Sequence, residues 1–87
     1  MDDLQKLYEA VVNGDAQTAR TVTEQALANK VEALILVNQY MAPAMAEVGK
    51  RFEDGDYYVP EMLIAARAMQ AGLKLLRPHL VVAGVKS

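Results

Sequence analysis

The stretch LILVNQYMAPAMAEVGKRFEDGDYYVP, residues 34–60, decides the fold. Its first apolar residues recur in steps of three and four, the spacing of one face of an α-helix. Pro43 has no N–H group and its ring opposes the carbonyl group of Gln39, so a kink or break is expected between Gln39 and Ala42. The sequence therefore predicts one helix that is kinked near Pro43. The apolar residues of this helix are Leu34, Val37, Met41, Met45, Val48 and Phe52.

A polar turn follows this helix and leads into the last helix. In Glu53-Asp54-Gly55-Asp56, Gly55 can take the positive φ that often ends a helix. Pro60 fits the first turn of the next helix, and Glu61 favours its positive end. This last helix is expected to loosen at Pro78. Its predicted inner face consists of Met62, Ala66, Met69, Leu73, Leu76 and Leu80.

Two shorter helices precede this pair. Asp2 or Asp3 can cap the first, which Asn13-Gly14 ends, and Asp15 can cap the second, which Asn29-Lys30 closes. The loops are short, so consecutive helices are expected to be antiparallel neighbours. The predicted fold is all-α: an antiparallel four-helix bundle whose third helix carries the kink. The apolar stripes are Leu4, Leu7, Tyr8, Val11 and Val12 in the first helix and the smaller Ala16, Ala19, Val22, Ala26 and Leu27 in the second.

Composition excludes several classes of function. A chain of 87 residues can bury one modest core. The net charge is -2 and the Lys and Arg residues are scattered, so nucleic acid is not an expected partner. The absence of cysteine fits a reducing cytoplasm. Met1-Asp2-Asp3 is acidic where a signal peptide would be basic, and no apolar run has the length of a membrane span, so a cytoplasmic protein without a membrane partner is predicted.

No set of side chains predicts catalysis or metal binding. His79 is the only histidine, and the Glu-x-x-His steps of bundles that bind two iron ions are absent. The acidic residues of 53–61 lack the spacing of a calcium loop, so a solvated turn is expected. Ser87 is the only serine, and the glycines match no phosphate-binding loop. The chain is therefore predicted not to be an enzyme, with no catalytic residue and no metal ligand.

Large apolar and aromatic side chains crowd around the acidic turn. Tyr57 and Tyr58 cannot easily be buried side by side on one core, so at least one should face outward. An exposed cluster of this kind at a helix junction usually indicates a contact surface. Periodicity leaves an alternative open, in which Phe52, Val59 and Met62 plug the open end of the bundle.

An ordered series of motifs carries a resemblance to a known family. M-x-x-V-G-x-x-F spans residues 45–52, G-x-x-x-x-P spans 55–60, A-x-x-M lies within 65–69, and P-x-L spans 78–80. This series resembles the helical cap domain that precedes the cobalamin-binding domain in methionine synthase and in the corrinoid proteins of methyltransferase systems. The resemblance covers nearly the whole chain and is densest from Met41 to Leu80.

The resemblance implies a shielding function. In that family the bundle packs over the upper face of the corrin ring, covers the cobalt-bound methyl group, and moves aside for a partner methyltransferase. By position, Phe52 corresponds to the aromatic residue that covers the methyl group, and Val59 and Met62 correspond to apolar residues beside it. Val59 is smaller than the usual leucine and would cover less of the ring. The further residues expected at the cobalamin-binding site are Met45, Val48, Gly49 and Tyr58.

The resemblance also implies a partner domain. The family's lower-face cobalt ligand is a histidine in an Asp-x-His-x-x-Gly motif on a following α/β domain, and this chain contains no such motif. Residues 1–80 are therefore predicted to form the cap, and residues 81–87 a linker toward an absent cobalamin-binding domain of the same parent chain. The fragment is expected not to retain cobalamin alone and to form homo-oligomers through its uncovered surface.

Two alternative functions remain. The related cap of a cobalamin-dependent light-sensing regulator uses a tryptophan and a Glu-His pair above the ring, and this chain has neither. A plain helical interaction or dimerisation module would have no corrinoid partner domain, and Phe52 would then matter for stability alone.

Overall fold

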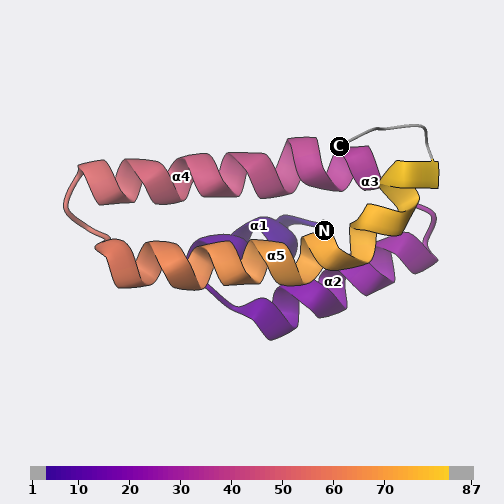
Figure 1. Cartoon of the computed structure of the whole chain (residues 1–87), viewed down its shortest axis with the longest axis horizontal. Helices are drawn as coiled ribbons and strands as arrows, with labels where there is room; N and C mark the ends of the chain where they lie inside the picture. Colours follow the sequence, from indigo (N-terminus) through magenta and orange to yellow (C-terminus); the bar gives the residue numbers. More distant parts are fainter. Residues whose placement is uncertain (1–3, 83–87) are drawn as a thin grey trace.

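Helices are the regular elements of residues 4–82, the part of the chain that the computed structural model describes. The predicted caps Asp2 and Asp3 lie outside this part. The elements α3, η1 and α4 follow one another without a break and together form the third helix. The predicted all-α, four-helix architecture is therefore confirmed (Figure 1). The elements are α1 (Gln5–Asn13), α2 (Ala16–Ala28), α3 (Ala33–Leu36), the π-helix η1 (Val37–Met41), α4 (Ala42–Glu53) and α5 (Val59–Val82).

The predicted ends of the first two helices are confirmed. Gly14 ends α1 in the left-handed conformation, with φ 74°. The Asp15 carboxylate caps α2, accepting hydrogen bonds from the Thr18 backbone N–H at 3.1 Å and from the Thr18 hydroxyl at 2.7 Å. Lys30 follows α2 with φ 67°, a conformation that non-glycine residues seldom adopt.

The Asp15 cap makes stability depend on pH. The hydrogen bonds from the Thr18 hydroxyl and N–H lower the pKa of Asp15 below 3.8, its ordinary value. Because the folded state favours the ionised carboxyl group, this contribution is complete above pH 3.8 and is lost as the pH falls through the lower folded-state pKa. Asp15→Asn should therefore cost stability at neutral pH, and the difference should shrink in strong acid. Urea unfolding of both proteins from neutral pH to strong acid measures this difference in stability. A difference that does not change with pH would contradict the proposed role of Asp15 ionisation.

The interruption predicted near Pro43 is present and takes the form of a π-helix. The π-helical stretch η1 ends at Met41, and Pro43 lies in the first turn of α4. Pro43 cannot donate a hydrogen bond to the carbonyl group of Gln39, and a wider turn makes room for its ring. The third helix changes its winding here without breaking.

The turn before α5 also agrees with the sequence, but the end of α5 does not. Gly55 has φ 82°, and the Glu61 carboxylate accepts a hydrogen bond from the Tyr58 backbone N–H at 2.7 Å. Pro78 was expected to loosen the helix, yet α5 continues through it to Val82. Pro78 has no N–H group to donate to the carbonyl group of Lys74. Both residues are exposed, so water can satisfy that carbonyl group. The helix thus extends two residues into the predicted linker; residues 83–87 lie outside the described part.

The predicted inner face of α5 requires a correction. Among residues 59–80 the buried ones are Ala65, Ala68, Gly72 and Leu76, so the prediction holds for Leu76, whereas the other five predicted residues are half-buried: Met62, Ala66, Met69, Leu73 and Leu80. The reason is the close contact of α5 with α2 (Figure 1). A Cβ atom at Gly72 would lie 2.7 Å from Cε of Met41 and 2.9 Å from the Thr23 hydroxyl oxygen. Only a small residue fits where α5 crosses α2 at Gly72, whereas Leu76, one turn later, is completely buried; most of the other large apolar residues of α5 lie at the edge of this side.

A candidate contact surface on α4 and α5

Most of the exposed large apolar residues gather at one place. Among residues 4–80 and apart from Leu34, they lie between Phe52 and Ile64, at the end of α4, in the turn and in the first two turns of α5. Tyr57 is half-buried and Tyr58 is 67% exposed, which confirms that one of the two tyrosines faces outward. An uncovered apolar surface therefore borders the α4–α5 turn.

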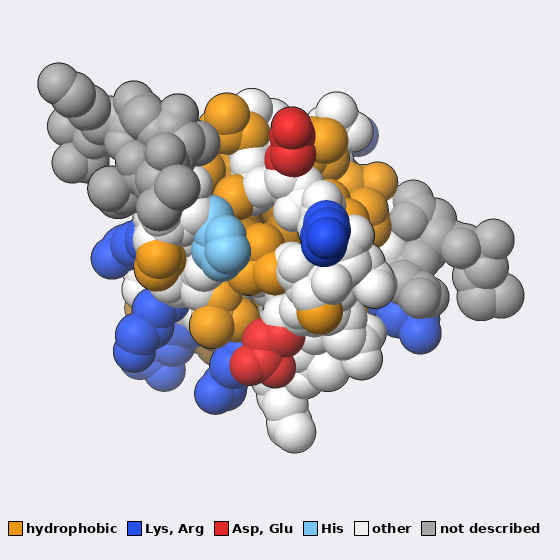
Figure 2. Space-filling model, turned by 90° about the vertical axis from the view of Figure 1, so that its right-hand side faces the viewer, with side chains coloured by type: hydrophobic (Ala, Val, Ile, Leu, Met, Phe, Trp, Pro, Cys, Tyr) orange, Lys and Arg blue, Asp and Glu red, His pale blue; other side chains and the backbone are white. Residues whose placement is uncertain are grey.

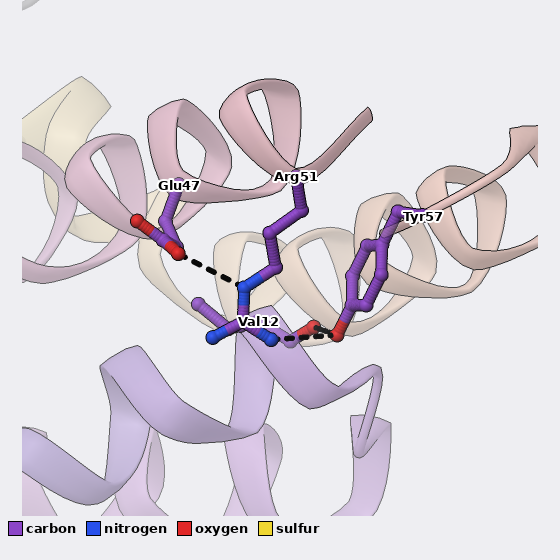
Figure 3. A network of polar contacts seen from close by, with 4 residues as sticks. All are labelled: Val12, Glu47, Arg51 and Tyr57. Atoms are coloured by element: carbon purple, nitrogen blue, oxygen red, sulfur yellow. Dashed lines mark hydrogen bonds and ion pairs between the residues drawn. The ribbon is translucent and has the colours of Figure 1, made fainter. Parts of the chain in front are cut away.

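The two sides of α4 have different environments. Glu47 and Arg51, one helical turn apart, lie on the side whose polar contacts reach α1 (Figure 3). Met45, Gly49 and Phe52 recur in steps of four and three and form a different stripe of the same helix. Phe52 is 44% exposed, and Met45 and Gly49 are half-buried. This second stripe is thus only partly covered by the rest of the chain.

The apolar surface continues past the α4–α5 turn into the first residues of α5. Val59 and Met62 are three residues apart and share one side of the helix. Val59 is 56% exposed and Met62 is half-buried. Since α4 and α5 contact each other and join at this end, both stripes border the same turn (Figure 1). We call the following residues the lid face: Met45, Gly49, Phe52, Tyr58, Val59 and Met62.

One predicted site residue does not belong to this surface. Val48 is completely buried, so it can support the lid face from within but cannot line it. The exposed fractions of Phe52, 44%, and Val59, 56%, favour a contact surface over a plug of the bundle end for these two residues. Leu63 was missed by the sequence analysis although it is 57% exposed. Its position four residues after Val59, on the same side of α5, was the available signal.

Gly49 has open space where its side chain would be. A Cβ atom there would meet no heavy atom within 4 Å, in contrast to Gly72. Glycine inside a helix costs about 0.5–1 kcal/mol relative to alanine. Contacts among the described residues do not require a glycine at this position. A flat group that approached the helix closely from outside would require one.

A polar network fixes the turn beside the lid face (Figure 3). The Tyr57 hydroxyl donates a hydrogen bond to the carbonyl oxygen of Val12 at 2.8 Å and accepts one from Arg51 Nη1 at 3.3 Å. Arg51 Nε donates to Glu47 Oε2 at 2.9 Å, and the guanidinium carbon lies 5.3 Å from the centroid of the Tyr57 ring. The Glu47 carboxylate first, and then Tyr57, raise the pKa of Arg51 above its usual value.

The opposite end of the bundle carries a separate groove. It has a volume of about 560 Å³ and is lined by Leu27, Lys30, Leu34 and His79, among others. Figure 2 shows the histidine beside apolar side chains on this face.

In the described part of the chain, no group of three or more His, Cys, Asp and Glu residues is arranged to hold a metal ion. Nor does any helix between residues 4 and 82 have the length and apolar character needed to cross a membrane.

The comparison with known proteins identifies the family. The family model described as the B12 binding domain matches residues 3–77. This chain belongs to that family. The chain is 33% identical over 75 residues to trimethylamine corrinoid protein 1 of Methanosarcina acetivorans, and 35% identical over 75 residues to trimethylamine corrinoid protein 1 of Methanosarcina mazei. Each comparison covers 86% of this chain and 35% of the relative.

A solved structure supports the same conclusion. The chain superimposes on the monomethylamine corrinoid protein of Methanosarcina barkeri with a TM-score of 0.82 and 29% sequence identity, covering 86% of this chain and 35% of that one. The resemblance predicted from the motifs is therefore confirmed. The chain spans about a third of the length of these corrinoid relatives.

Proposed function

We propose that this chain is the cap of a corrinoid methyl-carrier protein and covers the upper face of methylcobalamin held by another domain of the same parent chain. The observation that carries the proposal is the lid face, an exposed apolar surface that includes a glycine with open space in front of it. The corrinoid relatives supply the class of ligand. In this proposal the cap extends through Val82, and residues 83–87 lead to the partner domain.

The residues of the lid face fit a broad, flat cofactor. Phe52 would cover the position of the methyl group, with Val59 and Met62 beside it and Gly49 allowing close approach. Bound cobalamin would supply a reactive methyl–cobalt bond, and an apolar cover would keep water and oxidants away from it. Tyr58 carries the only ionisable side chain of the lid face, and shielding requires no proton transfer. The proposed role is therefore non-catalytic.

The same surface determines the proposed partners. A methyltransferase could reach the methyl group only after the cap moves aside, so such enzymes are expected to bind the parent protein in an open state. An isolated cap would leave the lid face uncovered. It would then self-associate and fail to retain cobalamin, because it would contact only one side of the cofactor. The cytoplasmic location predicted from the sequence is part of this proposal.

A chimaeric protein tests the shielding function. The chain would replace the matching segment of trimethylamine corrinoid protein 1 of M. acetivorans, and the product would be loaded with methylcobalamin. Phe52→Ala should accelerate photolysis in air about tenfold, because losing ~1.4 kcal/mol of aromatic contact changes the balance of closed and open states by that factor. The rate is followed by the absorbance change of the cofactor.

Leu34→Ala is the matched control for this experiment. Leu34 is 43% exposed, close to the 44% of Phe52, but it lines the groove at the other end of the bundle. Its removal should leave the photolysis rate unchanged. Equal rates for the Phe52→Ala protein and the unmodified chimaera would reject the shielding function and favour a plain interaction module.

A further inference from the structure

The α4–α5 turn holds together the two parts of the lid face. Phe52 precedes it, Tyr58 is its last residue, and Val59 follows it. Its backbone hydrogen bonds return to α4: the Asp56 and Tyr57 N–H groups donate to the carbonyl oxygen of Arg51 at 2.8 and 3.0 Å. These bonds give the turn its shape, but they do not set its position relative to α1.

Tyr57 connects the turn to α1. Its hydroxyl group donates to the carbonyl oxygen of Val12, which lies 45 residues earlier in the chain. Val12 is in the last turn of α1, where carbonyl groups have no donor from a following helical turn. The phenol thus satisfies a helix-end carbonyl group and joins the turn to the rest of the bundle at the same time.

Arg51 holds the Tyr57 side chain in place. The guanidinium group donates to the phenol oxygen from one side, lies over the ring, and is itself bound by Glu47. The phenol therefore accepts one hydrogen bond and donates its single proton to Val12. This arrangement restricts both the rotation of the ring and the direction of its hydroxyl group.

From this geometry we infer that Tyr57 is a positioning residue for the lid: it anchors the α4–α5 turn to α1 and so keeps Phe52 and Val59 over the cofactor. The inference rests on the proposed function. Without the hydrogen bond to Val12, the turn can move away from α1 while the contact between α2 and α5 stays intact. The closed cap then opens more often.

Tyr57→Phe in the methylcobalamin-loaded chimaera tests this inference. The variant keeps the ring beside Arg51 and removes both hydrogen bonds of the hydroxyl group. Photolysis should accelerate about 3- to 10-fold, the shift of an opening equilibrium expected from losing the hydrogen bond to Val12, which is the one of the two that joins the turn to α1. Amide hydrogen exchange at Asp56 and Tyr57 should accelerate by a similar factor, while exchange in the middle of α2 stays unchanged. Tyr8→Phe, which removes a hydroxyl group from α1 outside the network, should change neither.

The outcomes separate the two proposals. If Phe52→Ala accelerates photolysis but Tyr57→Phe leaves photolysis and turn exchange unchanged, the positioning role is wrong and shielding stands. If Tyr57→Phe accelerates exchange equally in the turn and in α2, the tyrosine acts on global stability, which also overturns the inference. If neither variant alters photolysis, both proposals fail.

Discussion

Gly72→Val should destabilise the domain by about 3 kcal/mol, the upper part of the range for overpacked cores. Gly72 is buried where α5 crosses α2, and even a Cβ atom would come within 2.7 Å of Met41 and 2.9 Å of Thr23. Met41 and Thr23 are completely buried, so neither can move into solvent without opening the core. The two γ-carbons of valine would therefore force the helices apart or displace Met41. The midpoint and slope of urea unfolding measure the change.

Gly49→Val provides the matched control for this prediction. It makes the same substitution inside a helix, but its Cβ atom would meet nothing within 4 Å. Valine has a better helix propensity than glycine, so stability should stay the same or rise by a few tenths of a kcal/mol. Similar losses of stability at both positions would show that the effect of Gly72→Val comes from the backbone and not from the close contact of α2 with α5.

Gly14→Ala should cost about 2–3 kcal/mol, from two separate causes. The first is backbone strain, because Gly14 has φ 74° and an L-residue pays about 1 kcal/mol in that region. The second is steric overlap, because the new Cβ atom would clash with the Ile64 Cγ2 atom and lie 3.2 Å from the Ile64 Cβ atom. Chemical unfolding gives the sum of the two.

A double-mutant cycle separates the two causes. Ile64→Ala removes the overlapping Cγ2 atom, so Gly14→Ala in that background should cost only the strain of about 1 kcal/mol. The coupling energy should thus be at least about 1 kcal/mol. If Gly14→Ala costs the same in both backgrounds, overlap with Ile64 does not contribute to the loss of stability.

The ends of the helices were predictable because their causes are local. Gly14, Asp15 and Gly55 act on residues within three or four positions of themselves, through backbone conformation or a capping hydrogen bond. The interruption near Pro43 likewise follows from the missing N–H group of one residue. Pro78 has the same chemistry, yet α5 continues through it to Val82; Pro43 and Pro78 are both exposed, so their exposure does not explain the difference.

The lid face was predictable in part. The crowding of aromatic and apolar side chains and the resemblance to corrinoid caps indicated Phe52 and Val59, whose exposure only the structure shows. Val48 belongs to the same motif but faces the interior. The Tyr57 hydrogen bond to Val12 joins residues 45 positions apart, so no local sequence pattern predicts it.

The sequence alone determined that this protein is a four-helix chain of the B12 binding family, because turns, caps and motifs act over a few neighbouring residues. Tertiary structure decided which side of α5 is buried. That helix has apolar residues on more than one side. The close approach of α2 requires a small residue at Gly72, the buried side also holds Ala65, Ala68 and Leu76, and most other large apolar side chains lie at the edge. Burial is a property of two surfaces in contact, and the periodicity of one helix describes only one of them.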